Sequence, residues 1–295
     1  PSYTFVSTAN AFVLRGAIPV FVDIRMDTCN IDENLIEEAI TEKTKAIVVV
    51  HYAGVACEMN KILEISKRNN LMLIEDAAQA VMSKYNGRTL GSIGDIGTYS
   101  FHETKNIISG EGGAIIVNNK NLAERAEFIR EKGTDRSRFL QGKIDKYTWV
   151  DIGSSYLPSD IIAAFLWAQM EEAENITKKR LNVWNYYHKN LEPLEEKGLI
   201  TRPTIPQGCE HNAHMYYVLL KNKEKRNDII KRLDELGINA IFHYIPLHNS
   251  PMGISSSRSC GDLKNTINIS DRIMRLPLWI GVNSERVTDV LMKIL

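Results

Sequence analysis

The chain has 295 residues, of which 44% are hydrophobic and 24% charged, and its 36 Lys and Arg side chains balance its 36 Asp and Glu side chains. This composition excludes a disordered chain, a collagen-like repeat and a disulfide-dense small domain. The lack of a basic excess argues against a nucleic-acid partner, and the lack of any apolar run near ~20 residues argues against a membrane-spanning segment.

The first half of the chain alternates short β-branched runs with amphipathic stretches. Strands are expected over residues 20–24, 45–50, 71–75, 97–101 and 113–117, and helices over 32–40, 58–68 and 121–132. The first of these helices would be capped by Asp32. This alternation indicates βαβ units, and therefore an α/β fold with a mostly parallel central sheet flanked by helices.

The second half begins with a long helical pattern from Ser159 to about Leu191. A helix of that length commonly bridges two domains. Beyond it, strands are expected over residues 215–220 and 239–244, and helices over 224–236 and after Ser284. We therefore expect a large domain over residues 1–190 and a smaller α+β domain over residues 191–295.

Several common signatures are missing from the sequence. It contains no GxGxxG after a strand, no GxxxxGK[ST], no HExxH and no GxSxG, so the usual nucleotide-binding, zinc-protease and hydrolase functions lack their key residues. Cys29, Cys57, Cys209 and Cys260 are far apart and form no CxxC pair. We expect them to be reduced, which favours a cytoplasmic location.

Polar motifs lie at the carboxyl ends of two neighbouring predicted strands, at residues 75–79 and 100–106. Ligands of an open α/β sheet bind beyond the carboxyl ends of its strands. Asp76 and Lys105 are the minimum set for pyridoxal phosphate (PLP) chemistry, since the amine can form the imine that holds the cofactor and the carboxylate can pair with its pyridine nitrogen. A hydroxyl such as that of Ser100 could hold the cofactor phosphate. Spacing alone leaves a plainer interpretation open, in which Asp76 is a turn residue and Lys105 is solvated.

Six short strings give stronger evidence than the spacing of Asp76 and Lys105. They are PSYTF, HYAG, EDAAQ, SFHETKN, SGEGG and FHYIPLH. In this order they closely resemble the sugar-nucleotide aminotransferases of the DegT/DnrJ/StrS family, which have the PLP-dependent transferase fold of type I. GSSYLPSD, LWAQ and FHYIPLH resemble in particular the subgroup that aminates dTDP-4-keto-6-deoxy-D-glucose to the 4-amino-4,6-dideoxygalactose sugar nucleotide.

The resemblance implies a role for five residues at the cofactor. Lys105 matches the Schiff-base lysine, and Asp76 matches the acid on the pyridine nitrogen. Gln79 matches a side chain that bonds the 3-hydroxyl, and Ser100 matches a phosphate ligand. Phe5 falls where an aromatic ring stacks on the cofactor, the alternative being a core phenylalanine at a strand end.

The resemblance also implies substrate-side residues. The segment from His243 to His248 matches one that comes from the smaller domain and helps to close the site, and we favour His248 as the substrate contact. His102 is a further candidate, although a lone histidine in a loop is more often a structural hydrogen-bonder.

Two departures from the family pattern stand out. Family members carry several dozen residues before PSYTF, including a helix start that grips the cofactor phosphate, so we expect this chain to be a fragment of a longer protein rather than a degraded relative. Ser155 and Leu157 stand where many members have Asn and Arg. Ser155 would replace the Asn that reaches a phosphate in the partner subunit's site, which implies a homodimer with shared active sites.

The resulting expectation is a PLP-dependent transamination in surface-polysaccharide sugar biosynthesis, with L-glutamate as amino donor and a keto-sugar nucleotide as acceptor. One alternative is a PLP-dependent sugar dehydratase, but those relatives have His at the position of Lys105. The other is a non-catalytic, regulatory relative.

Overall fold

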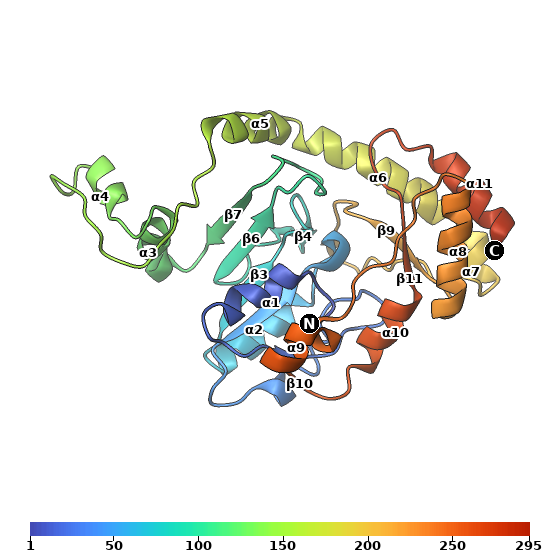
Figure 1. Ribbon diagram of the computed structural model, residues 1–295, viewed down its shortest axis with the longest axis horizontal. Helices are drawn as coiled ribbons and strands as arrows, with labels where there is room; N and C mark the ends of the chain where they lie inside the picture. Colours follow the sequence, from blue (N-terminus) through green and yellow to red (C-terminus); the bar gives the residue numbers. More distant parts are fainter.

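A four-stranded sheet lies at the centre of the computed structural model, which describes residues 1–295 (Figure 1). Its strand order is β2-β3-β6-β7, formed by β2 (Ala46–Val50), β3 (Met72–Asp76), β6 (Ile96–Ser100) and β7 (Gly113–Val117). The first three strands are parallel, and β7 is antiparallel to β6. The prediction of a mostly parallel central sheet is therefore confirmed.

The parallel strands are stabilised because their apolar side chains are buried against a helix that packs on the sheet. Ile47 and Leu73 lie in one hydrophobic cluster with Ile62 and Ile65 of α2 (Met59–Arg68), whose apolar residues recur at helical spacing. Asp76 pairs in register with Thr98, so the carboxyl ends of β3 and β6 meet at one edge of the sheet. This edge carries the two polar motifs found in the sequence.

A second region is built on the antiparallel pair β9 (Tyr216–Leu219) and β11 (Ile273–Leu276). Residues of α6 (Ala173–Asn190), α8 (Lys223–Glu235) and α11 (Ser284–Ile294) share a hydrophobic cluster with these strands. A smaller cluster joins Tyr3 and Tyr52 to Tyr217 and Ile273, so the first residues of the chain pack against this second region. We retain the boundary between two domains near residue 190 as a proposal.

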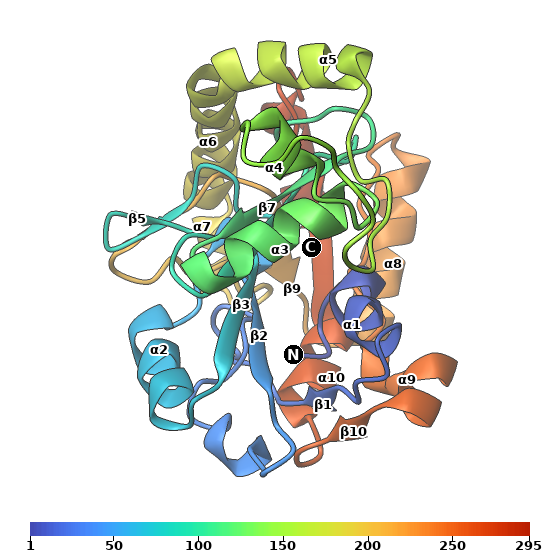
Figure 2. The same cartoon turned by 90° about the vertical axis from the view of Figure 1, so that its left-hand side faces the viewer.

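The remaining elements are short or lie at the periphery (Figures 1 and 2). The helices are α1 (Val6–Val13), α3 (Lys120–Arg130), α4 (Arg136–Leu140), α5 (Asp160–Glu171), α7 (Glu192–Glu196), α9 (Pro251–Ser256) and α10 (Lys264–Arg272). The strands are β1 (Val20–Phe21), β4 (Lys84–Tyr85), β5 (Arg88–Thr89), β8 (Cys209–Glu210) and β10 (Arg258–Ser259), and the 3-10 turns are η1 (Glu37–Ala39), η2 (Tyr52–Gly54) and η3 (Leu247–Asn249). No helix combines the length and the apolar character that crossing a membrane requires. All four cysteines are free.

Two predicted helices were wrong in extent. Over residues 32–40 only η1 forms, because Asp32 folds back on its own loop: its Oδ1 accepts from the Asn34 backbone N–H (3.0 Å) instead of capping a helix. The predicted helix 159–191 is two helices that meet at Glu172, and Figure 2 shows the change of direction between α5 and α6. The bend lets Ala173 pack in a buried cluster with Phe101 and Ile107.

Two predicted strands were also wrong. Residues 239–244 make only a single bridge, between Ile241 and Arg275, since the segment turns away so that His243 and Tyr244 can contact other aromatic rings. Residues 20–24 form a strand only at β1, which pairs with β10.

The buried carboxylate of Glu75 holds the loop between β5 and β6 by hydrogen bonds. Its carboxylate accepts hydrogen bonds from the backbone N–H groups of Gly91 (2.8 Å), Ile93 (2.6 Å) and Gly94 (2.7 Å). His51 Nδ1 accepts from the Cys57 N–H (3.2 Å), so His51 Nε2 carries the proton and donates to Glu75 (2.9 Å). Burial acts to raise the pKa of Glu75, but these donors outweigh it and hold the pKa below its usual value.

Glu75→Gln is expected to lower the free energy of unfolding by about 2–4 kcal/mol, because an amide nitrogen would face N–H donors in a buried site. Since the folded-state pKa lies below the unfolded one, this stabilisation is present at neutral pH and is lost as the pH falls through the folded-state value. Urea unfolding followed by circular dichroism measures the change. The control is Glu42→Gln, at an exposed position, which should shift stability by no more than about 0.5 kcal/mol. Equal effects of the two substitutions would contradict the argument.

Candidate functional site

Asp76, the last residue of β3, is held in one orientation at the sheet edge. Its Oδ2 accepts a hydrogen bond from the Thr8 hydroxyl (2.5 Å), and its Oδ1 accepts from the Ala78 backbone N–H (3.1 Å). Thr8 lies on α1 and is itself hydrogen-bonded to the Thr4 hydroxyl (2.8 Å). The N-terminal helix therefore fixes a carboxylate at the end of a central strand. No local pattern in the sequence pointed to Thr8.

Lys105 lies half-buried in the loop between β6 and β7, near enough to Asp76 for the two charges to interact. Burial lowers the pKa of its amine, the Asp76 carboxylate opposes that shift, and the Arg275 guanidinium adds to it. The net effect is a pKa below the ordinary value of a lysine. A larger fraction of the amine is thus unprotonated and able to act as a nucleophile or a base.

A buried polar network holds the loop that carries Lys105. Asn106 donates from Nδ2 to the Asn212 carbonyl (2.8 Å) and accepts at Oδ1 from His214 Nδ1 (3.1 Å). Asn212 in turn donates to the Gln79 carbonyl (2.9 Å). Burial, followed by the charges of Lys105 and Arg275, lowers the pKa of His214 well below its usual value, so the ring is neutral. These positioning residues were not predicted from the sequence, because their partners are distant along the chain.

Gln79 is buried, and its side-chain amide bonds to other parts of the site. Oε1 accepts from the Ala53 backbone N–H (2.7 Å), and Nε2 donates to the Tyr244 hydroxyl (3.1 Å). Tyr244 belongs to the FHYIPLH string, so Gln79 ties this segment to the sheet edge. Its implied bond to the cofactor hydroxyl remains a proposal.

Phe5 and Ser100 are the two other residues for which the resemblance implies a cofactor contact. Phe5 immediately precedes α1 and is 60% exposed, so the alternative of a core residue at a strand end is wrong. Its ring centroid is 6.4 Å from that of Tyr244. Ser100 ends β6, and its hydroxyl accepts from the His102 backbone N–H (3.4 Å). A stacking role for Phe5 and a phosphate-binding role for Ser100 are proposals.

The three candidate histidines have different surroundings. His243 is hydrogen-bonded through Nδ1 to the Tyr52 hydroxyl (2.9 Å), and burial, followed by the charges of Arg275 and Lys105, lowers its pKa to about 2. His248 bonds to the Ser2 hydroxyl (2.7 Å). His102 bonds to the nearby Thr104 hydroxyl (2.9 Å). The charge of Lys105 is thus one of the causes that lower the pKa of His243.

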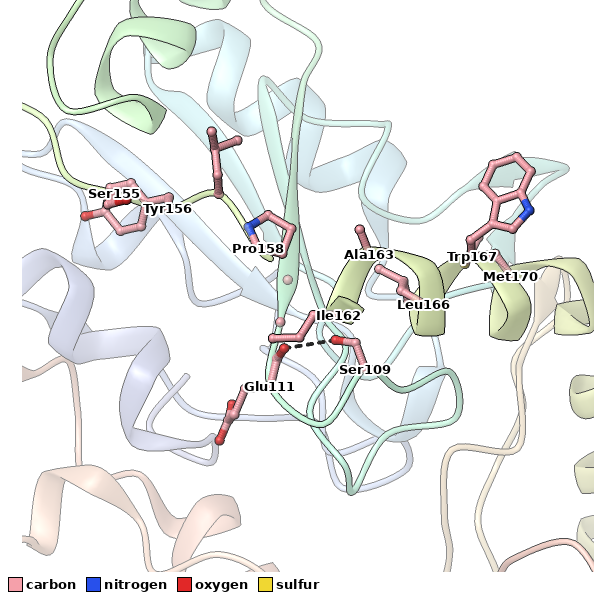
Figure 3. Close-up of a pocket in the computed structure, with 13 residues that line it drawn as sticks. Ser109, Glu111, Ser155, Tyr156, Pro158, Ile162, Ala163, Leu166, Trp167 and Met170 are labelled. Carbon is pink, nitrogen blue, oxygen red and sulfur yellow. Dashed lines mark hydrogen bonds between the residues drawn. The ribbon is translucent and has the colours of Figure 1, made fainter. Parts of the chain in front are cut away.

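Ser155 lies in a separate place, on a surface pocket of about 490 Å³ beside α5 (Figure 3). The pocket is also lined by Ser109, Glu111 and apolar side chains that include Ile162, Leu166 and Trp167. Neither Lys105 nor Asp76 is among its lining residues. Ser155 is therefore not part of the cluster that this chain builds around Lys105.

Arg275 is a charged residue whose influence on Lys105 was not predicted from the sequence. It is the one charged side chain in β11, whose sequence is Ile-Met-Arg-Leu. A charge inside an apolar strand was the available signal, because such a charge is costly unless it has a function or a partner.

The residues gathered at the sheet edge fit PLP. They supply an amine of lowered pKa, a fixed carboxylate whose charge reaches it, and a hydroxyl at the end of the next strand. That Lys105, Asp76 and Ser100 would hold the cofactor's aldehyde carbon, ring nitrogen and phosphate is a proposal.

Comparison with known proteins places this geometry among aminotransferases. The model of the DegT/DnrJ/EryC1/StrS aminotransferase family matches residues 1–295. GDP-perosamine synthase from Caulobacter vibrioides is 38% identical over 255 residues, which cover 85% of this chain and 66% of that protein. Among solved structures, a DegT DnrJ EryC1 StrS aminotransferase from Brucella abortus is 28% identical with a TM-score of 0.89, covering all of this chain and 78% of that one. DesV from S. venezuelae, solved with a ketimine intermediate, is 28% identical with a TM-score of 0.87, covering 100% of this chain and 76% of that one.

Proposed function

Because the chain belongs to the DegT/DnrJ/EryC1/StrS aminotransferase family, we propose that it transfers the amino group of L-glutamate to a keto-sugar nucleotide. The chain is an aminotransferase and its cofactor is PLP. The observation that carries the proposal is the pair of Lys105 and Asp76: an amine of lowered pKa beside a carboxylate that Thr8 fixes.

Each residue of the pair has a separate task. When bound, PLP supplies a conjugated ring that accepts the electron pair left as a C–H bond of the substrate breaks. Lys105 holds the cofactor, and its free amine takes the proton from the donor carbon and returns it at the neighbouring position. Asp76 carries the negative charge that keeps the ring nitrogen protonated, and Thr8 keeps that carboxylate in place.

The acceptor is a 4-keto-6-deoxy sugar linked to a nucleoside diphosphate. The relative from Caulobacter is named as a GDP-perosamine synthase, which supports an activated sugar as substrate. The subgroup resemblance in FHYIPLH and GSSYLPSD favours dTDP-4-keto-6-deoxy-D-glucose over a GDP-linked sugar.

The active enzyme is a homodimer in which Ser155 serves the partner's site. Large apolar side chains near that residue are exposed, among them Trp149 (76%), Ile161 (83%) and Trp167 (69%), and a partner subunit would cover them. Light scattering should give twice the chain's mass, and a stable monomer with full activity would contradict the proposal.

A labelled-donor assay tests the reaction. The PLP-loaded protein is incubated with ¹⁵N-labelled L-glutamate and either the dTDP-linked or a GDP-linked 4-keto-6-deoxy sugar, and the products are analysed by mass spectrometry. We expect ¹⁵N in the dTDP-linked sugar. Loss of water without nitrogen gain would indicate a dehydratase instead, and no change in either sugar would refute sugar-nucleotide transamination.

A further inference from the structure

The hydroxyls of Thr4 and Thr8 form a hydrogen-bonded series that ends on the carboxylate of Asp76. The Thr8 hydroxyl is 2.5 Å from Asp76 Oδ2, and the Thr4 hydroxyl is 2.8 Å from that of Thr8. A threonine inside a helix often bonds back to the carbonyl four residues earlier, which for Thr8 would be the carbonyl of Thr4. Here the Thr8 side chain instead joins the Thr4 hydroxyl to a carboxylate 68 positions away, so these two partners determine its rotamer.

The direction of both hydrogen bonds follows from the chemistry of the groups. An ionised carboxylate can only accept, so Thr8 donates its one hydroxyl proton to Asp76. The Thr8 oxygen is then left to accept, so Thr4 donates to Thr8. Donation to the Thr8 oxygen polarises the Thr8 O–H bond and strengthens the hydrogen bond that it makes to the carboxylate. The contribution of Thr4 to Asp76 therefore passes entirely through Thr8.

Thr4 is itself held in place by the two residues before it. The Ser2 hydroxyl is bonded to His248 Nδ1 (2.7 Å). The Tyr3 hydroxyl donates to the His243 carbonyl. Thr4 is only 3% exposed, so its hydroxyl bonds to Thr8 rather than to water. The start of the hydroxyl series is thus anchored to the segment between His243 and His248, and its end lies at the edge of the central sheet.

We propose that Thr4 is a positioning residue of the aminotransferase, which acts on the reaction through Thr8 and Asp76. This inference rests on the proposed function, because it assumes that Asp76 pairs with the protonated ring nitrogen of PLP. The Thr4 hydroxyl selects the Thr8 rotamer that donates to Asp76, and so keeps the carboxylate in one orientation toward the ring. A residue that acts in this way should affect the rate and the binding of the cofactor only while the Thr8 hydroxyl is present.

A double-substitution cycle in the PLP-loaded protein tests this dependence. Thr4→Val exchanges the hydroxyl for a methyl group and should lower kcat by about two- to fivefold, less than the loss of about tenfold expected for Thr8→Val. In the Thr8→Val background, Thr4→Val should cause no further loss, because its effect has no other route to Asp76. Thr4→Ser keeps the hydroxyl and should retain nearly the full rate. The control is Thr201→Val, which changes an exposed threonine and should leave kcat unaltered.

Cofactor binding gives a readout that does not depend on turnover. Titration of the cofactor-free protein with PLP, followed by absorbance, measures the dissociation constant. This constant should rise by about two- to fivefold in Thr4→Val and stay unchanged in Thr4→Ser and Thr201→Val. Thr4→Val leaves no buried donor without an acceptor, so its melting temperature without cofactor should fall by no more than about 4 °C. A larger fall would assign Thr4 a purely structural role and contradict the inference.

Two further results would overturn the inference. One is an equal loss of kcat on Thr4→Val with and without the Thr8 hydroxyl, which would show that Thr4 acts by another route. The other is an unchanged kcat and an unchanged PLP affinity in Thr4→Val while Thr8→Val and Asp76→Asn are impaired. Failure of the proposed role of Asp76 looks different, because Asp76→Asn would then keep nearly normal activity, and the inference on Thr4 would fall with it.

Discussion

Lys105→Ala is expected to abolish transamination, lowering kcat by about 10⁴-fold or more, because one amine both holds the cofactor and moves the proton. The covalent link between cofactor and protein should disappear with the activity. Borohydride reduction followed by mass spectrometry of the intact chain measures the link, and the labelled-donor assay measures turnover.

Two further variants make this result specific. Lys105→Arg keeps the positive charge beside Asp76 but cannot release its proton, so it should be as inactive as Lys105→Ala. Lys221→Ala changes an exposed lysine and should leave both measurements unaltered. Full activity in Lys105→Ala, or a mass gain on reduction of that variant, would assign the cofactor to another lysine.

Asp76→Asn is expected to lower kcat by about 10²- to 10³-fold, since a neutral amide replaces the charge that stabilises the protonated ring nitrogen. The side chain keeps its shape: the amide oxygen can still accept from the Ala78 N–H, and the amide nitrogen can donate to the Thr8 hydroxyl oxygen, so the melting temperature should change little. Steady-state kinetics and thermal unfolding of the same preparation separate lost chemistry from lost folding.

Thr8→Val provides the matched comparison, because it leaves the carboxylate and removes only the hydroxyl that donates to it. Its effect on kcat should be about tenfold, the value of one hydrogen bond to a charged group. Nearly normal activity of Asp76→Asn would contradict the assignment of Asp76 to the ring nitrogen. An equal loss of kcat in both variants would show that the orientation of the side chain, rather than its charge, determines the rate.

The central sheet could be predicted because its signals are local. The β-branched run of β2 and the helical spacing of Ile62 and Ile65 in α2 are readable within a few residues. Predictions were wrong where a distant contact determines the backbone: Ala173 bends the long helix against Phe101, and Tyr244 leaves its predicted strand to meet Gln79.

For the site, the short strings that follow two strands, together with the family resemblance that they carry, pointed to Lys105 and Asp76 as the candidate residues. The surroundings of these two residues depend on contacts between distant parts of the chain. Thr8 reaches Asp76 across 68 positions of the chain, and Asn106 meets His214 across 108. The unpaired state of Arg275 is likewise visible only in three dimensions, because the absence of a partner depends on every segment that packs around it. Charge, burial and hydrogen bonding at this edge of the sheet are properties of the assembled chain, and they set the pKa of Lys105 on which the proposed reaction depends.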